Sequence, residues 1–372
     1  MRVCFVCGNI YPLLAKRTDI PIVGGAEVQQ YLIGQELARQ GVEVSYVTED
    51  FGQGTETVHD NFRVLAYKYS RNKVVQGLTI WRALEQANAD LYYVRGVPKF
   101  LAILLMYCAI RRRQFVIGMS SNHTVYPKTG LSLPHYLTYR LALKVCALII
   151  AQTNFQAMKL AQNYGIGEAV VIRNGTEISS LQSTSVKEKK EILWIGSIHP
   201  YKGVEKVFEL AQALPNQRFV IVGGPSRGME GYYEQIRVKA QHFSNIKWRG
   251  LIPNEHINEE LSGALALINT TVTYYGVPNL EGFPNVYLEA WRNGVPTLTI
   301  DNDPDEIICQ NGLGYHCQTI QQMANDLEQL AHNPILREQI GKAAREYCER
   351  EHEIKKIARQ YVSVFTRIVD RG

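Results

Sequence analysis

The sequence of 372 residues lacks the features that define several large classes of protein. Its longest apolar stretch, from Phe100 to Ile110, is about half of the roughly 18 residues that a membrane-spanning helix needs. The N-terminus has no basic lead followed by an apolar stretch and a small-residue cleavage site, so no signal peptide is predicted. We therefore expect a cytoplasmic protein. A hydrophobic fraction of 46% excludes a disordered chain.

The cysteines predict neither a disulfide framework nor a complete zinc site. The seven cysteines are odd in number and scattered, which is not a disulfide framework. Cys4 and Cys7 have the spacing of a metal or redox pair, but no second pair completes a zinc site. Because both lie in an apolar strand pattern, we expect them to pack in the core.

Two common nucleotide-binding fingerprints are absent. No G-x-G-x-x-G follows the first strand, which ends at Gly8, and the glycine-rich segment 223–228 lacks the G-K-[ST] ending of a P-loop. The sequence therefore excludes a dinucleotide-dependent dehydrogenase and a P-loop nucleotidase. No Ser-His-Asp or paired-carboxylate arrangement occurs at a convincing spacing either.

What is present is a regular alternation of strands and helices, which predicts parallel α/β units. The polar stretch 176–191 interrupts the alternation and reads as a linker. We predict a Rossmann-like domain over residues 1–178, a linker over 179–191, a second Rossmann-like domain over 192–352, and a C-terminal helix over 353–372. Strands are expected at 3–7, 42–47, 62–66, 91–94, 115–118, 148–151, 192–195, 218–222, 246–249, 264–268 and 296–300.

Charge is divided unequally between the two halves. Residues 1–175 hold 19 Lys/Arg and 11 Asp/Glu, whereas residues 176–372 hold 21 and 24. A basic N-terminal half fits contact with an anionic membrane or an anionic acceptor, and it fits an ordinary solvated surface equally well. Arg111 to Arg113, after the apolar stretch, are the candidate membrane contact. No nucleic-acid partner is predicted, and the oligomeric state stays open.

The most informative segment is EGFPNVYLEAWRNGVP, residues 281–296. Pro284 suits the first turn of a helix and Gly294 the position after its end. The N-terminus of such a helix is a site for an anion such as a diphosphate. Glu281 and Glu289 are suited to accept hydrogen bonds from sugar hydroxyls. Together these features indicate a nucleotide-sugar pocket, although a surface helix with ordinary acidic residues would show the same two carboxylates.

This segment resembles the signature of glycosyltransferase family 4, the retaining group 1 enzymes with the GT-B fold. Further matching segments run along both predicted domains: GGAE at 24–27, SSNH at 120–123, RNGTE at 173–177, LWIGSIHPYKGVE at 193–205 and FVIVGGP at 219–225. The resemblance implies two Rossmann-like domains facing each other across a cleft, with the C-terminal helix packing back on the N-terminal acceptor-binding domain.

The resemblance also implies roles for residues of the second domain. Glu289 matches the residue that binds the ribose, Glu281 the residue at the transferred sugar, and Lys202 the lysine that neutralises the diphosphate. The amides of Phe283, Asn285 and Val286 match those around the diphosphate. The turn at Gly196 also matches, but the family's arginine is replaced by Ser197, which carries no charge. Either another cation, such as His199 or Arg173, replaces that charge, or the helix amides carry more of the binding, or the transferase is weakened.

In the first domain five positions follow strands or precede a helix on the side expected to face the cleft. Gly24 and Gly25 open a helix and are placed to approach the donor. His123 matches a histidine that contacts the donor sugar, and Arg95 and Asn122 are candidate acceptor contacts. A tight turn and satisfied polar side chains are the alternative explanations for these residues.

The function predicted from these observations is transfer of a hexose, with retention, from a nucleotide diphosphate sugar to a glycan or lipid-linked acceptor of cell-surface polysaccharide synthesis. A UDP-sugar is the favoured donor and GDP-mannose the second choice. The catalytic candidates are Glu281, Lys202 and His123. No metal and no cofactor are expected, because the nucleotide sugar is a co-substrate. The alternatives are a nucleotide-sugar epimerase and a non-catalytic protein that binds nucleotide sugars or glycans.

Overall fold

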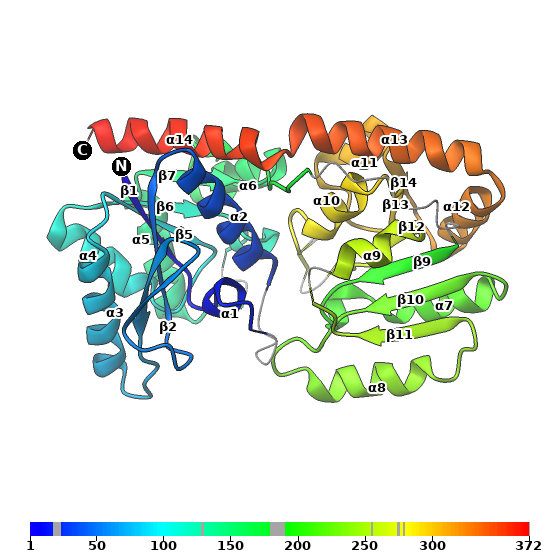
Figure 1. Cartoon of the computed structure of the whole chain (residues 1–372), viewed down its shortest axis with the longest axis horizontal. Helices are drawn as coiled ribbons and strands as arrows, with labels where there is room; N and C mark the ends of the chain where they lie inside the picture. Colours follow the sequence, from blue (N-terminus) through cyan, green and yellow to red (C-terminus); the bar gives the residue numbers. More distant parts are fainter. Residues whose placement is uncertain are drawn as a thin grey trace. The chain divides into compact units, whose positions relative to one another are not determined.

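The computed structural model describes residues 1–17, 24–127, 130–178, 190–253, 256–273, 276–277 and 280–371. The chain forms two compact units (Figure 1). Unit 1 contains Met1–Glu177 together with Ile354–Gly372, and unit 2 contains Ile178–Glu353. The chain therefore leaves unit 1 once and returns to it at the C-terminal end.

The sheet of unit 1 has eight strands in the order β3-β4-β2-β1-β5-β6-β7-β8. All neighbours are parallel except β3 and β4. The strands are β1 (Arg2–Val6), β2 (Glu43–Glu49), β3 (Glu56–His59), β4 (Phe62–Tyr67), β5 (Leu91–Arg95), β6 (Gln114–Gly118), β7 (Leu148–Ala151) and β8 (Val170–Val171). Cys4 and Cys7 lie buried at β1, which confirms that they pack in the core.

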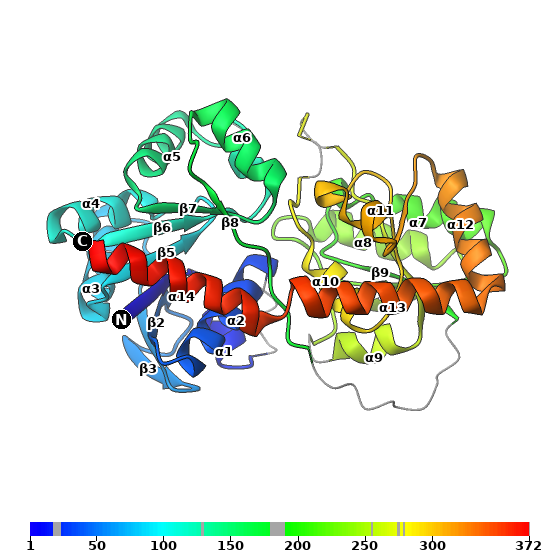
Figure 2. The same cartoon turned by 90° about the horizontal axis from the view of Figure 1, so that it is seen from above.

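Helices cover both faces of this sheet. One hydrophobic cluster joins the sheet to α3, α4, α5 and α6, and another joins it to α1, α2 and α14. The helices are α1 (Tyr11–Leu14), α2 (Gly25–Arg39), α3 (Lys73–Ala87), α4 (Leu101–Arg111), the 3₁₀ helix η1 (Asn122–Val125), α5 (Leu133–Val145), α6 (Asn154–Tyr164) and α14 (Ile354–Arg371). Figure 2 shows α14 lying along α2.

The C-terminal helix α14 completes the core of unit 1. It buries Ile354, Ile357, Tyr361 and Phe365 in the same cluster as Phe5 and Tyr93 of the central strands. The rings of Tyr93 and Phe365 lie 5.9 Å apart. The prediction that the C-terminal helix packs on the N-terminal domain is thus confirmed.

Unit 2 has a six-stranded parallel sheet in the order β11-β10-β9-β12-β13-β14. Its strands are β9 (Glu191–Ile195), β10 (Arg218–Val222), β11 (Ile246–Gly250), β12 (Ala264–Asn269), β13 (Thr297–Thr299) and β14 (Gly314–His316). Its helices are η2 (Pro200–Lys202), α7 (Glu205–Ala213), α8 (Glu230–Ala240), α9 (Ile257–Ser262), α10 (Asn285–Arg292), η4 (Pro304–Glu306), α11 (Ile307–Asn311), α12 (Ile320–His332) and α13 (Pro334–Glu351).

These two Rossmann-like sheets confirm the predicted fold class. The strands β3, β8 and β14 were not predicted. Among the described residues, none of the helices combines the length and the apolar character that crossing a membrane requires.

Candidate active site

The centre of the candidate site is an ion pair between Lys202 and Glu281, 79 residues apart in the sequence. Both side chains are largely buried, with exposed fractions of 14% and 12%. Burial lowers the pKa of the Lys202 ammonium to about 7. The Glu281 carboxylate acts in the opposite direction, because a neighbouring negative charge favours the protonated amine. The sequence predicted each residue separately, and unit 2 brings them into contact.

A tight turn places Lys202 at the carboxyl end of β9. Gly203 follows the lysine with a φ of +61°, and a Cβ atom there would lie 2.2 Å from the carbonyl oxygen of Thr270. Only glycine tolerates both the left-handed backbone and this approach. The Lys202 carbonyl in turn accepts a hydrogen bond of 2.9 Å from the Thr270 hydroxyl. The lysine is therefore fixed to the end of the neighbouring strand β12.

The Glu281 carboxylate is oriented by Asn269, at the end of β12, and by Thr271, which follows that strand. The Thr271 hydroxyl donates to Oε2 at 2.9 Å, and the Asn269 side-chain amide donates to the same oxygen at 3.4 Å. Asn269 also accepts a hydrogen bond from the Thr271 amide at 3.0 Å. Sequence reasoning missed both residues. Their position at the carboxyl end of a central strand, where open α/β sheets bind ligands, was the available signal.

The helix α10 begins next to Glu281. Gly282 has a φ of +77°, which turns the chain into Phe283, and Pro284 is the N-cap of the helix. The Phe283 ring is buried against Trp291 and His352, so a ligand at this end of the helix would meet the backbone of Phe283 and not its ring. The N-terminal amides of a helix and its dipole favour an anion. Asn285 and Val286 open the helix at this end.

Glu289 lies on α10, one turn after Asn285, and is partly buried. Burial raises the pKa of its carboxyl group, and the charge of Arg292 opposes this shift. Within the described residues no side chain or backbone group hydrogen-bonds to the Glu289 carboxylate. Its oxygens are thus available to hydroxyl donors outside the chain.

The loop after β9 contains the predicted Gly196 and Ser197. Gly196 lies close to Lys202, since a Cβ atom on it would be 3.8 Å from Nζ. Ser197 is exposed. His199, proposed as a replacement cation, has its pKa lowered by burial and by the charge of Lys202. An imidazole with a lowered pKa is mostly neutral at neutral pH, which leaves Lys202 as the cation of this loop.

Unit 1 holds the remaining predicted residues. Gly24 is the exposed N-cap of α2 and Gly25 its first residue. Arg95, at the end of β5, is 9% exposed and donates to Asn174 at 2.6 Å. Asn122 is 3% exposed and accepts a hydrogen bond from Gln156, so its side chain belongs to a buried polar network. His123, in η1, is partly buried.

Comparison with known families decides the classification. The family described as "Glycosyl transferases group 1" matches residues 176–347, and the family described as "Glycosyltransferase Family 4" matches residues 23–180. The two matches together cover every strand of both Rossmann-like sheets except β1, and the first contains the whole Lys202–Glu281–α10 arrangement. The chain belongs to glycosyltransferase family 4. It is an enzyme of the retaining type, with a nucleotide sugar as donor, and the family typically acts without a metal ion.

Several known proteins are similar to this glycosyltransferase in sequence or in fold. An uncharacterized glycosyltransferase of Haemophilus influenzae is 22% identical over 93% of this chain and 97% of its own length. A GDP-mannose-dependent monoacylated α-(1-6)-phosphatidylinositol monomannoside mannosyltransferase of Corynebacterium glutamicum is 27% identical, but over 41% of this chain and 40% of its own. Among solved structures, the sucrose-phosphate synthase of Thermosynechococcus elongatus covers 100% of both chains with a TM-score of 0.79 and 16% identity.

A second solved structure is HepE of Anabaena, in complex with UDP and glucose. It is 17% identical, has a TM-score of 0.78, and the alignment covers 99% of this chain and 100% of HepE. At such identities these likenesses establish the GT-B fold. Two further features of the sequence lie outside the described residues: Tyr274 and Tyr275, candidates either for the lining of a sugar pocket or for an enlarged surface loop, and residues 19–23, a candidate acceptor loop.

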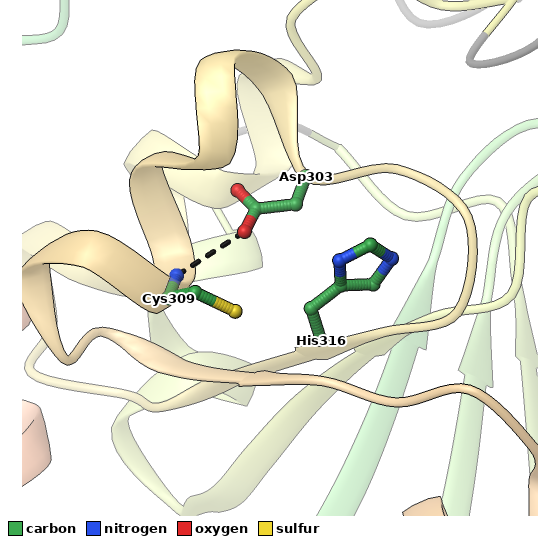
Figure 3. A group of neighbouring side chains, drawn as sticks. All are labelled: Asp303, Cys309 and His316. Atoms are coloured by element: carbon green, nitrogen blue, oxygen red, sulfur yellow. Dashed lines mark hydrogen bonds between the residues drawn. The ribbon is translucent and has the colours of Figure 1, made fainter.

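A separate cluster of potential metal ligands lies after β13 and at the end of β14 of the glycosyltransferase (Figure 3). Ligand atoms of Asp303, Cys309 and His316 all lie within 4.8 Å of one another. The Asp303 carboxylate already accepts hydrogen bonds from the amides of Ile308 and Cys309, at 2.8 and 3.1 Å. It thereby caps the short helix α11, which accounts for its burial without an ion. No step of the reaction is placed at this cluster.

Proposed function

We propose that this glycosyltransferase moves a hexose from a UDP-sugar to a lipid-linked or glycan acceptor of cell-surface polysaccharide synthesis. The observation that carries the proposal is the buried pair of Lys202 and Glu281 at the N-terminus of α10, with the Glu289 carboxylate available one turn into the helix. A cation and helix amides suit a diphosphate, and two carboxylates suit the hydroxyls of a ribose and a hexose.

In the proposed reaction the bond between the sugar C1 and the diphosphate oxygen breaks, and the acceptor oxygen bonds to C1 on the same face. The acceptor hydroxyl proton passes to a diphosphate oxygen, so no separate base is needed. Lys202 and the first amides of α10 stabilise the negative charge that develops on the leaving diphosphate. Glu281, oriented by Thr271 and Asn269, holds the hexose and keeps Lys202 in position. His123, Arg95 and the Gly24–Gly25 turn serve the sugar and acceptor side.

The choice of donor and the alternatives can be tested together. UDP-glucose and GDP-mannose are compared by the rise in melting temperature they cause, and then by product formation on an acceptor panel. A UDP-hexose that raises the melting temperature and is transferred supports the proposal. A response to GDP-mannose alone would mean that GDP-mannose is the donor and that the UDP-sugar is not. The mannosyltransferase of Corynebacterium glutamicum makes that comparison essential. Interconversion of two nucleotide sugars without acceptor would indicate an epimerase, and donor binding without any turnover a binding protein.

Chelation by EDTA is expected to leave the transfer rate unchanged within about twofold. The charge on the leaving diphosphate is met by Lys202 and the helix α10, so no divalent ion is required at that point. The measurement is the initial rate before and after dialysis against EDTA. Loss of activity that Mg²⁺ or Mn²⁺ restores would contradict this, and a Cys309→Ser/His316→Ala variant would then show whether the ion binds at the Asp303 cluster.

A further inference from the structure

The outward face of α5 in unit 1 is unusually apolar for an exposed helix. Leu133, Leu137, Leu141 and Val145 follow one another at intervals of four residues and are 62%, 53%, 53% and 51% exposed. This spacing places them in one stripe along the helix. The opposite side of α5, with Tyr139, Ala142 and Leu143, packs into the core of unit 1. The stripe is therefore an additional apolar surface and not part of the core.

Basic side chains border this stripe. Arg140 and Lys144 are exposed on α5 between the apolar positions. The helix α4, which packs beside α5 (Figure 2), also exposes the apolar side chains of Met106 and Ile110. The whole segment of 77 residues from Leu91 to Gly167 contains nine Lys/Arg and not one Asp or Glu. An apolar stripe on a segment whose own charged side chains are all basic is complementary to a surface that is anionic outside and apolar beneath.

The three arginines at 111–113 contribute less than the sequence suggested. The Arg111 guanidinium is paired with Glu85 at 2.9 Å, and the Arg113 guanidinium donates to Asn88 at 2.7 Å and lies 3.9 Å from Asp90. Acidic neighbours from α3 and the loop after it thus compensate two of the three charges. The basic groups of α5 have no such acidic neighbours in their own segment.

We propose that the outer face of α5, defined by Leu133, Leu137, Leu141 and Val145 with Arg140 and Lys144, docks on an anionic phospholipid bilayer. The leucines enter the boundary between headgroups and acyl chains, while the two basic groups contact lipid phosphates. The function of this contact rests on the proposed lipid-linked acceptor. The binding itself is a property of unit 1, and it can be measured without an assay of sugar transfer. A second copy of the chain is the competing occupant of the same face.

The test is co-sedimentation of the full chain with vesicles of phosphatidylglycerol and phosphatidylcholine, against vesicles of phosphatidylcholine alone. We expect binding to the anionic vesicles that falls steeply with added salt. The double variant Arg140→Ser/Lys144→Ser should weaken binding to the anionic vesicles by about 25-fold, because the loss of each basic group contributes a factor of about five. Leu137→Ser/Leu141→Ser should weaken it by about tenfold or more. The matched control is Val238→Ser/Ile335→Ser, which alters two exposed apolar residues of unit 2 and should change nothing.

A positive readout comes from Leu137→Trp, which keeps the stripe apolar. Its fluorescence should be quenched by phospholipids brominated in their acyl chains, whereas that of Ile335→Trp in unit 2 should not. Equal binding to neutral vesicles, no binding to either kind, or equal loss in the control variant would overturn the proposal. So would a dimer that the α5 variants dissociate while vesicle binding stays unchanged. Vesicle binding without sugar transfer would leave the docking surface standing and remove the proposed function instead.

Discussion

Replacing Lys202 by methionine is expected to lower kcat/KM by about 10²- to 10³-fold. The lysine is the cation of the loop after β9, and removing one preorganised donor to a developing negative charge typically has an effect of this size. Initial rates with the preferred donor measure it. Lys206→Met, four residues further along on α7, is the matched control and should retain full activity.

The loss must be separated from the strain of an unpaired, largely buried Glu281 carboxylate. The double variant Lys202→Met/Glu281→Gln removes that unpaired charge and restores stability without restoring the cation. If the double variant regains activity near the parent level, the role of Lys202 is structural and its assignment to the diphosphate is wrong.

The same lysine should make donor affinity depend on pH. The pKa of Lys202 is lowered to about 7 by burial, and the protonated form binds the diphosphate. Affinity is therefore highest below pH 7 and falls as the pH rises through 7, by about tenfold per unit, until the pKa of the bound state is reached. A nucleotide sugar is the suitable ligand, because its diphosphate does not titrate in this range. An affinity that is flat across this range in the parent would contradict the shift, and the Lys202→Met variant should be flat.

Glu289→Ala is expected to weaken donor binding by about ten- to a hundredfold. A partly buried carboxylate that accepts ribose hydroxyls makes charge-assisted hydrogen bonds, and the net loss of one such bond is about 1.5–3 kcal/mol, where about 1.4 kcal/mol corresponds to a factor of ten. Titration calorimetry with the nucleotide sugar and with the free nucleoside diphosphate should show the same loss. Glu289→Gln, which keeps the size and one acceptor oxygen, should lose less. Unchanged affinity in the alanine variant would mean that the ribose binds elsewhere.

The sequence could predict those parts of the site whose residues lie close together along the chain. The segment from Glu281 to Gly294 contains its own helix start, its own helix end and both carboxylates, so it reads as one unit without any tertiary information. The alternation of strands likewise predicts two parallel sheets. By contrast β3, with the sequence Glu-Thr-Val-His, is short, polar and antiparallel at the edge of its sheet, and its residues lack a clear apolar alternation.

Contacts that depend on strand register could not be derived from spacing. Thr271 and Asn269 meet Glu281 because β12 ends beside the turn that precedes α10, and nothing in the intervening segment encodes that distance. The direction in which a side chain points could not be derived from the sequence either. Asn122 follows the carboxyl end of β6, as expected, but its side chain turns inward to Gln156.

The return of α14 to unit 1 has a consequence for how the protein is made on the ribosome. The rings that pack on Tyr93 from α14 are Tyr361 and Phe365, which are synthesised after the whole of unit 2. During translation the part of the N-terminal sheet that α14 covers therefore stays exposed while unit 2 can already complete its core. The usual order, in which the N-terminal domain folds first, is reversed for the final packing step. A nascent chain stalled before Ile354 would present that part of the sheet to chaperones, and release of the last turns of α14 would end the exposure.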